Sequence, residues 1–191
     1  MVYRIQNFDA LAVNDLRRDA LAIAEAGYTA INTGEAIRRK VHLENDVLRI
    51  GDATYSLFGR RVYFVGIGKC ALDAALAIET LLGDTLTSGV AFDVASREQK
   101  PLTKTEIFIG THPLPSEVNV QATKRIVEFL AGREESDLVI MLISGGGSTL
   151  LCSPVAPMTC IDEGMLFSEL TGRGATIQDI NTIRKHTSRA R

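Results

Sequence analysis

Tryptophan is absent from this chain of 191 residues, and aromatic residues make up only 6% of it. So few flat side chains leave little surface on which nucleic-acid bases could stack. The charges are nearly balanced as well, because 21 lysines and arginines against 23 aspartates and glutamates give a net charge of −2 at pH 7. A balanced composition argues against nucleic acid or an anionic membrane as a partner.

Cysteine is scarce, and long apolar runs are missing. Cys70, Cys152 and Cys160 form no C-x-x-C pair, and an odd number fits no disulfide framework. We interpret them as small buried apolar side chains in a reducing compartment. The first 20 residues lack the continuous apolar segment of a signal peptide, and no run approaches the ~18–20 residues of a membrane span. The expectation is a cytoplasmic protein that does not bind membranes.

What the chain does contain is an alternation of apolar strands and amphipathic helices. Its length and its 46% hydrophobic content suit one domain with a real core. The predicted strands cover 61–68, 89–94, 105–110 and 137–143, and the helices between them cover 69–83 and 117–132. This order predicts an α/β fold: a Rossmann-like three-layer sandwich with a mostly parallel sheet and helices on both faces. The last strand, without polar alternation, is expected to be covered on both faces.

The remaining elements flank this unit. They are a helix over 8–28 that stops at Gly27, a short helix over 34–41 capped by Thr33, a hairpin around Gly51 and Asp52, and two C-terminal helices divided at 171–174, the second capped by Thr176 with Asp179. Ligands of such folds bind outside the carboxyl ends of the strands. The loops at those ends are therefore the places to search for chemistry.

The first such loop carries a glycine fingerprint, Gly66-x-Gly68-x-x-Ala71, with Lys69 inside it. Glycines let the backbone approach an anion, and the start of the following helix attracts negative charge. A lysine in the first helical turn opposes the helix dipole, which a bound anion would explain. The alternative is a tight turn with a solvated lysine, and the pattern alone does not decide between them.

The second loop is Ser144-Gly145-Gly146-Gly147-Ser148, after the last strand. Small residues before a helix form a nest of backbone N–H groups, and two hydroxyls add donors, which favours a phosphate or carboxylate cradle. The alternative is a flexible connection, which is unusual directly behind a buried strand.

Two further segments carry weaker signals. His112, in a turn stiffened by two prolines, would donate to an anion or act in acid–base chemistry, or else merely cap the sheet edge. No second histidine or cysteine stands at metal-ligand spacing, so no metal site is predicted. The last basic segment offers Asn181, Arg184 and Lys185 as an anion-binding helix face, with a solvated helix end as the alternative.

Four segments taken together carry a family resemblance: VGIGKCALDAALAIETLLGD, GTHPLPSE, DLVIMLISGGGSTLL and GATIQDINTIRKHTS. Their order resembles the glycerate 2-kinase family of the MOFRL-containing type, some members of which are labelled hydroxypyruvate reductase. The resemblance implies ATP-dependent phosphorylation of D-glycerate to 2-phosphoglycerate, with Mg²⁺ held mainly by the nucleotide. Lys69 matches the lysine that the family uses at its active site. Cys70 and Thr149 depart mildly from the family pattern, and Thr187 more strongly.

The resemblance also implies an incomplete unit. Family members continue past the equivalent of Ser188, complete this domain, add a C-terminal domain and supply a catalytic arginine. We therefore expect residues 1–191 to be a single truncated α/β domain, inactive unless the missing half is supplied by a partner chain or a homo-oligomer.

Two other functions stay open from the sequence. An NAD(P)-dependent hydroxypyruvate reductase would use the glycine fingerprint, with Asp93 on the ribose hydroxyls. A non-catalytic remnant or binding module would have neither activity.

Overall fold

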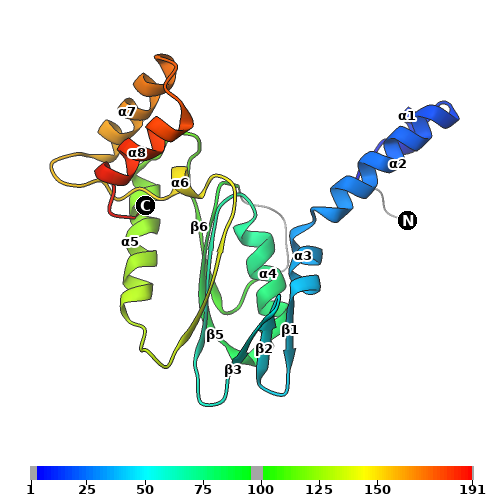
Figure 1. Cartoon of the computed structure of the whole chain (residues 1–191), viewed down its shortest axis with the longest axis horizontal. Coiled ribbons are helices and arrows are strands. Elements are labelled where there is room, and N and C mark those ends of the chain that lie inside the picture. The colour runs from blue at the N-terminus through cyan, green and yellow to red at the C-terminus, as the bar shows by residue number, and fades with distance from the viewer. Residues whose placement is uncertain (1–3, 96–100, 191) are drawn as a thin grey trace.

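A four-stranded sheet forms the centre of the computed structural model, which describes residues 4–95 and 101–190 (Figure 1). Its strands are β4 (Val62–Ile67), β5 (Leu86–Asp93), β6 (Thr105–Ile109) and β7 (Leu138–Ile143). They lie in the order β6-β5-β4-β7, and every neighbouring pair is parallel. All four strands were predicted, and their carboxyl ends meet at one edge of the sheet. The parallel α/β prediction is confirmed.

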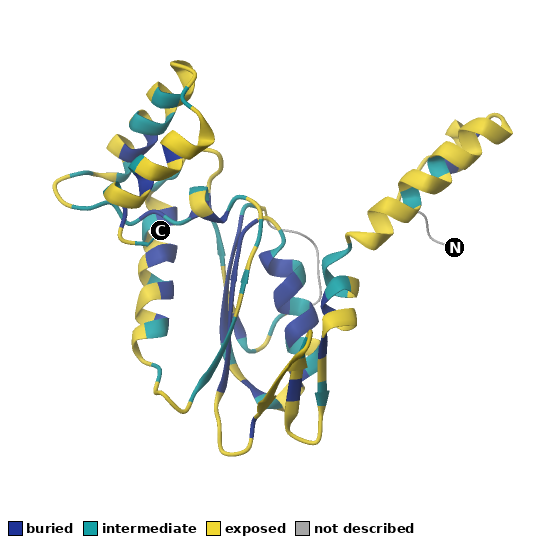
Figure 2. Cartoon of the chain, in the orientation of Figure 1, coloured by how far each residue is buried: buried dark blue, intermediate teal, exposed yellow. Residues whose placement is uncertain are grey.

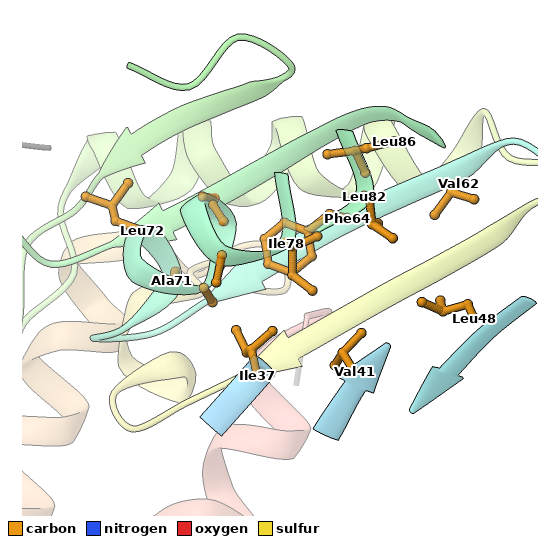
Figure 3. Packing of buried hydrophobic residues seen from close by; sticks show 14 of the residues in the cluster. Ile37, Val41, Leu48, Val62, Phe64, Ala71, Leu72, Ile78, Leu82 and Leu86 are labelled. Carbon is orange, nitrogen blue, oxygen red and sulfur yellow. The ribbon is translucent and has the colours of Figure 1, made fainter. Parts of the chain in front are cut away.

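Helices pack on both faces of this sheet. On one face α4 (Ala71–Leu82), followed by the short 3-10 turn η1 (Gly83–Thr85), contributes Leu72 and Ile78 to an apolar cluster with Phe64 of β4, as Figure 3 shows. On the other face α5 (Glu117–Ala131) places Ile126 and Phe129 in a second apolar cluster with the remaining strand residues. The three layers agree with the predicted sandwich.

The strand β7 departs from expectation. Met141 is 47% exposed and Ile143 is 65% exposed, whereas every residue of β4 is buried (Figure 2). Both strands are apolar, but β4 lies between two neighbours and β7 lies at the edge of the sheet. The prediction that β7 is covered on both faces is therefore wrong for the described part of the chain, because composition does not reveal a strand's place in the sheet.

The N-terminal segment is two helices where one was predicted. A break after α1 (Phe8–Leu11) is followed by α2 (Asp15–Ala30), where Asn14 Oδ1 accepts a hydrogen bond from Arg17 N at 2.9 Å. This local cap competes with continuation of the first helix. Gly27 does not end α2, which continues to Ala30. Figure 1 shows α2 projecting away from the sheet, and no residue of it is buried.

A small antiparallel sheet lies between the N-terminal helices α1 and α2 and the central sheet in the chain order. The helix α3 (Thr33–Lys40) leads into β1 (Val41–Glu44), β2 (Val47–Ile50) and β3 (Ala53–Ser56), which pair in chain order. The hairpin around Gly51 and Asp52 is confirmed as the β2–β3 turn. The cap of α3 is Asn32 rather than Thr33, because Asn32 Oδ1 accepts from Glu35 N at 2.9 Å. The strand β1 was missed, and the predicted helix over 34–41 ends one residue early, because Val41 begins this strand.

Three helices follow β7 near the carboxyl edge of the sheet: α6 (Gly147–Leu150), α7 (Cys160–Gly172) and α8 (Ile177–Thr187) (Figure 1). The predicted cap of α8 is confirmed, with Asp179 N donating to Thr176 Oγ1 at 3.2 Å. Beyond α8 the chain pairs back, since Arg189 N donates to Ser153 O at 2.8 Å. None of the helices in the described ranges is long and apolar enough to cross a bilayer.

Candidate functional site

Three loops converge at the carboxyl edge of the sheet, following β4, β6 and β7. The loop after β4 is anchored to its neighbour strand, because Gly68 N donates to Phe92 O at 3.0 Å. It is anchored to the loop after β7 as well, because Lys69 N donates to Gly145 O at 2.9 Å. The two glycine-rich segments, about 75 residues apart in sequence, therefore form one structural unit at the edge where such folds bind ligands.

The contact between these loops explains two of the predicted site residues. A Cβ atom on Gly68 would lie 2.3 Å from Ser144 Oγ, and Gly68 has a φ of +118° that other residues rarely adopt. The Ser144 hydroxyl accepts from Cys70 N and donates to Ile67 O, both at 3.3 Å. Gly68 and Ser144 thus hold the loop after β4 against the loop after β7. Any contact that they make with a ligand stays a prediction.

Gly66 also has a packing role. Its Cβ would lie 3.0 Å from ring carbons of Phe64 and 3.2 Å from Ala71 O. A larger residue would push the start of α4 away from the strand. The first glycine of the fingerprint is therefore explained by the close approach of a helix to the sheet.

Asp93 is the residue on which the reductase hypothesis depends, and it is fully buried. Its carboxylate accepts hydrogen bonds from Leu72 N at 3.0 Å and from Val94 N at 2.6 Å. It therefore caps the beginning of α4 from the end of β5 and faces protein amides. The expectation that Asp93 binds ribose hydroxyls is wrong, because its carboxylate is inside the core.

Lys69, His112 and Gly146 meet above this unit. A Cβ on Gly146 would lie 3.2 Å from Lys69 Cε and 3.3 Å from both Cδ2 and Nε2 of His112. Gly146 has a φ of +88°, so its backbone conformation also favours glycine. His112 is exposed at the surface, but the groups packed beside its ring remove part of its hydration. This desolvation, and secondarily the nearby Lys69 ammonium, lower the pKa of His112 below its ordinary value. The site thus pairs a lysine with an imidazole that stays neutral at physiological pH.

The predicted nest of amides includes two of its three glycines. Gly147 is buried, its N–H donates to Ser144 O at 3.2 Å, and its Cβ would lie 3.2 Å from Ile143. No backbone carbonyl in residues 4–95 or 101–190 accepts from the N–H of Gly145 or Gly146. By the same criterion the N–H of Ser148 has no backbone acceptor in the described ranges, so Gly145, Gly146 and Ser148 supply the amides of this loop that an anion can use.

A cavity lies next to the loop of residues 144–148. Its volume is about 350 Å³, and its lining includes Ser148 from α6 and Asn181, Arg184 and Lys185 from α8. Arg184 is only 5% exposed, and its guanidinium lies 4.5 Å from the centre of the Phe167 ring. The structure therefore brings the last serine of the glycine loop together with the three C-terminal residues named from sequence.

Two functional candidates were missed, Asn119 and Thr123. Both lie on the buried face of α5, with exposures of 0% and 1%. Asn119 accepts from Thr111 N and donates to Leu150 O, each at 3.0 Å. Polar residues in an apolar helical stripe are the signal that could have identified them, since a buried polar group needs partners.

The thiols behave largely as expected. Cys152 is fully buried, while Cys70 and Cys160 are half-buried, and all three are free. Burial raises the pKa of Cys152, whose Sγ donates to the buried Glu163 Oε2 at 3.3 Å. Within the described ranges, no group of three histidines, cysteines or carboxylates is arranged to hold a metal ion.

Comparison with known proteins identifies the family of this chain. Residues 19–191 match the family described as "Domain of unknown function (DUF4147)". Glycerate kinase of Bos taurus is 35% identical over 188 residues, covering 91% of this chain and 36% of the relative. A putative hydroxypyruvate reductase of Agrobacterium vitis is 38% identical over 130 residues, covering 67% of this chain and 29% of the relative.

A solved structure shows the same fold. The crystal structure of glycerate kinase from Thermotoga maritima superimposes with a TM-score of 0.73 at 29% identity, covering 88% of this chain and 38% of that one. The chain thus spans little more than a third of the length of the bovine and Thermotoga proteins. By the extent of the family match, the chain belongs to the DUF4147 family and is a homologue of glycerate kinases.

Proposed function

We propose that this chain forms the anion-binding part of an ATP-dependent D-glycerate 2-kinase, which produces 2-phosphoglycerate. The observation that carries the proposal is the meeting of Lys69, His112 and Gly146 at the carboxyl edge, beside unused backbone amides. A transferred phosphoryl group needs positioning and charge neutralisation rather than covalent chemistry. A lysine next to bare backbone N–H groups supplies both.

Each side chain has a role in this proposal. The Lys69 ammonium neutralises negative charge on the phosphoryl group in flight, while the N–H groups of Gly145 and Gly146 bind its oxygens. His112 accepts the proton that the 2-hydroxyl of glycerate loses as its oxygen attacks the γ-phosphorus. A neutral imidazole can accept this proton, and the lowered pKa of His112 keeps it neutral.

The neighbouring cavity suits the second anionic group. Ser148, Asn181 and Lys185 line it with a hydroxyl, an amide and an ammonium, which are donors that bind a carboxylate or a phosphate. The described residues offer no carboxylate cluster for Mg²⁺. The ion would therefore be held mainly by the nucleotide phosphates, whose charge it neutralises.

Turnover is a separate claim from binding. The relatives named glycerate kinase are much longer than the part that this chain matches. We propose that catalysis also requires the part of the fold that corresponds to the remainder of those relatives. The free thiols agree with a cytoplasmic location for such an enzyme.

Isothermal titration of the chain with Mg-ATP and, separately, with D-glycerate tests the proposal, alongside a coupled assay of ADP release. We expect binding of at least one ligand, and Lys69→Met should weaken it by about tenfold or more, the loss of one charge-assisted contact. Lys124→Met removes the same charge from the exposed surface of α5 and should leave binding unchanged. If neither ligand binds, the proposed function is wrong.

The reductase alternative lacks support at its acidic residue, because Asp93 is buried. NADH fluorescence provides a direct check. If adding the chain enhances NADH fluorescence, and neither ATP nor glycerate binds, an oxidoreductase becomes the better proposal. Binding of ATP or glycerate with no ADP release identifies a binding module that needs a further portion for catalysis.

A further inference from the structure

The loop that carries His112 and the loop that carries Gly146 are joined beneath the site by hydrogen bonds of the buried Asn119 side chain. Gly146 O accepts from Leu150 N at 3.0 Å, and Leu150 O accepts from Asn119 Nδ2 at 3.0 Å. On its other side, Asn119 Oδ1 accepts from Thr111 N at 3.0 Å, one residue before His112. A continuous path therefore runs from Gly146 through α5 to His112.

Both polar atoms of the Asn119 side chain are used in these hydrogen bonds. Its Oδ1 also accepts from the hydroxyl of Thr111 at 3.0 Å and from Ser116 N at 3.1 Å, while its Nδ2 donates a second bond to Thr111 O at 3.1 Å. The side chain is fully buried, and Gly110 leaves room for it, since a Cβ there would lie 3.0 Å from Nδ2. Both ends of the turn around His112 are thereby fixed to one amide.

Thr123 provides a second attachment one helical turn later. Its hydroxyl donates to Asn119 O at 2.7 Å and accepts from Cys152 N at 2.9 Å. The chain leaving α6 is therefore held to α5 at two points, Leu150 and Cys152. A buried polar pair that is fully satisfied in this way fixes the relative positions of the segments it joins.

We propose that Asn119 and Thr123 are positioning residues that hold His112 against Gly146 and Lys69. They touch no substrate and act by setting the separation of two loops whose side chains do. The catalytic meaning of this separation rests on the proposed function, whereas the geometric claim can be tested without activity. A displacement of 1 Å between reacting groups is enough to lower a rate strongly.

The pH titration of the His112 ring, followed by NMR and assigned with His112→Gln, measures this separation. Lys69 lies beside the imidazole and, with partial desolvation of the ring, lowers the pKa of His112. Asn119→Ala and Thr123→Val should let the loops part and raise the pKa of His112 toward its ordinary value, in the direction that Lys69→Met also produces. Thr171→Val is the matched control, because it removes the same hydroxyl bond to a carbonyl four residues earlier on exposed α7.

Circular dichroism separates this role from a merely structural one. Folded variants with lower thermal stability but an unchanged His112 titration would overturn the proposal. If Asn119→Ala does not fold, Thr123→Val decides, and the unmodified chain must in any case show a nuclear Overhauser contact between the His112 ring and Gly146. A raised His112 pKa in the variants, with no binding of Mg-ATP or D-glycerate by the unmodified chain, would uphold the positioning and reject the proposed function.

Discussion

The two glycine-rich loops of this chain look alike in sequence and differ in what their glycines do. At the end of β4 and in the loop after it, Gly66 and Gly68 make room for protein: an aromatic ring, the start of α4 and the Ser144 backbone. In the loop after β7, a Cβ on Gly145 would meet nothing within 4 Å, and Gly146 borders on Lys69 and His112. One loop is closed by packing, and the other is open at the site.

This difference separates stability from function along the sheet edge. Substitutions in the first loop must disturb the core before they affect any ligand. Substitutions at Gly145 and Gly146 lie closer to the chemistry and farther from the core. The two loops are nevertheless one unit through the bond from Lys69 N to Gly145 O. Replacing the glycines of both loops by alanine, one at a time, should therefore show which of them affect stability and which affect ligand binding.

Gly68→Ala should have the largest effect on stability. The new Cβ would clash with Ser144 and the residue would be forced into positive φ, which together cost about 3 kcal/mol of the free energy of unfolding. Chemical denaturation measures the loss. Gly27→Ala is the control, because this interior position of α2 is open and alanine there should stabilise by about 0.5–1 kcal/mol. Equal stabilities for the two variants would contradict the packing role of Gly68.

Gly146→Ala should have an intermediate effect on stability and a strong one on binding. Positive φ costs about 1–2 kcal/mol, and the Cβ would displace Lys69 and His112 by a few tenths of an ångström. Denaturation together with titration by Mg-ATP separates the two consequences. Unchanged binding in the folded variant would show that the cluster of Lys69 and His112 is not the anion site.

Gly145→Ala should leave stability within about 0.5 kcal/mol, because the added Cβ meets no atom and φ is not positive. Binding of an anion against this amide should nevertheless weaken by about tenfold, which is 1.4 kcal/mol. Isothermal titration beside a melting curve makes the comparison. Full binding by this variant would place the ligand elsewhere, with the cavity at Ser148 and Asn181 next to be tested.

Sequence patterns predicted most of the fold for a physical reason. The strands β4 to β7 and helices α4 and α5 are long, and their apolar periods reflect burial directly. The same patterns failed where the outcome depends on tertiary position. The edge location of β7 and the cap at Asn14 leave no trace in hydrophobic periodicity.

Residue types in the sequence identified the candidate site, but not the contacts that its residues make with one another. Lys69, His112 and the glycine loop were identified because their residue types are unusual after strands. Gly68 leaves room for Ser144, whereas Gly146 leaves room for His112. Both close approaches join residues about 35–75 positions apart in the sequence, which no local pattern contains. Asp93 shows the same limit, since a carboxylate at the end of a strand suits both a ribose and the helix beside it.

The smallest effect expected concerns His112 and pH. The pKa of His112 is lower in the folded chain than its ordinary value of 6.5, so between these two values the unfolded chain binds the extra proton. Stability from this group is therefore present above the ordinary value and is lost as pH falls through the window between them. Denaturation at about pH 7.5 and about pH 5.5 should show a smaller drop in His112→Gln than in the unmodified chain. Lys69→Met should reduce the drop only in part, because desolvation is the larger cause of the lowered pKa and the lysine the smaller. An identical drop in all three chains would mean that the pKa of His112 is not lowered in the folded chain, so that neither the packing around its ring nor the nearby Lys69 acts on it as the proposed site requires.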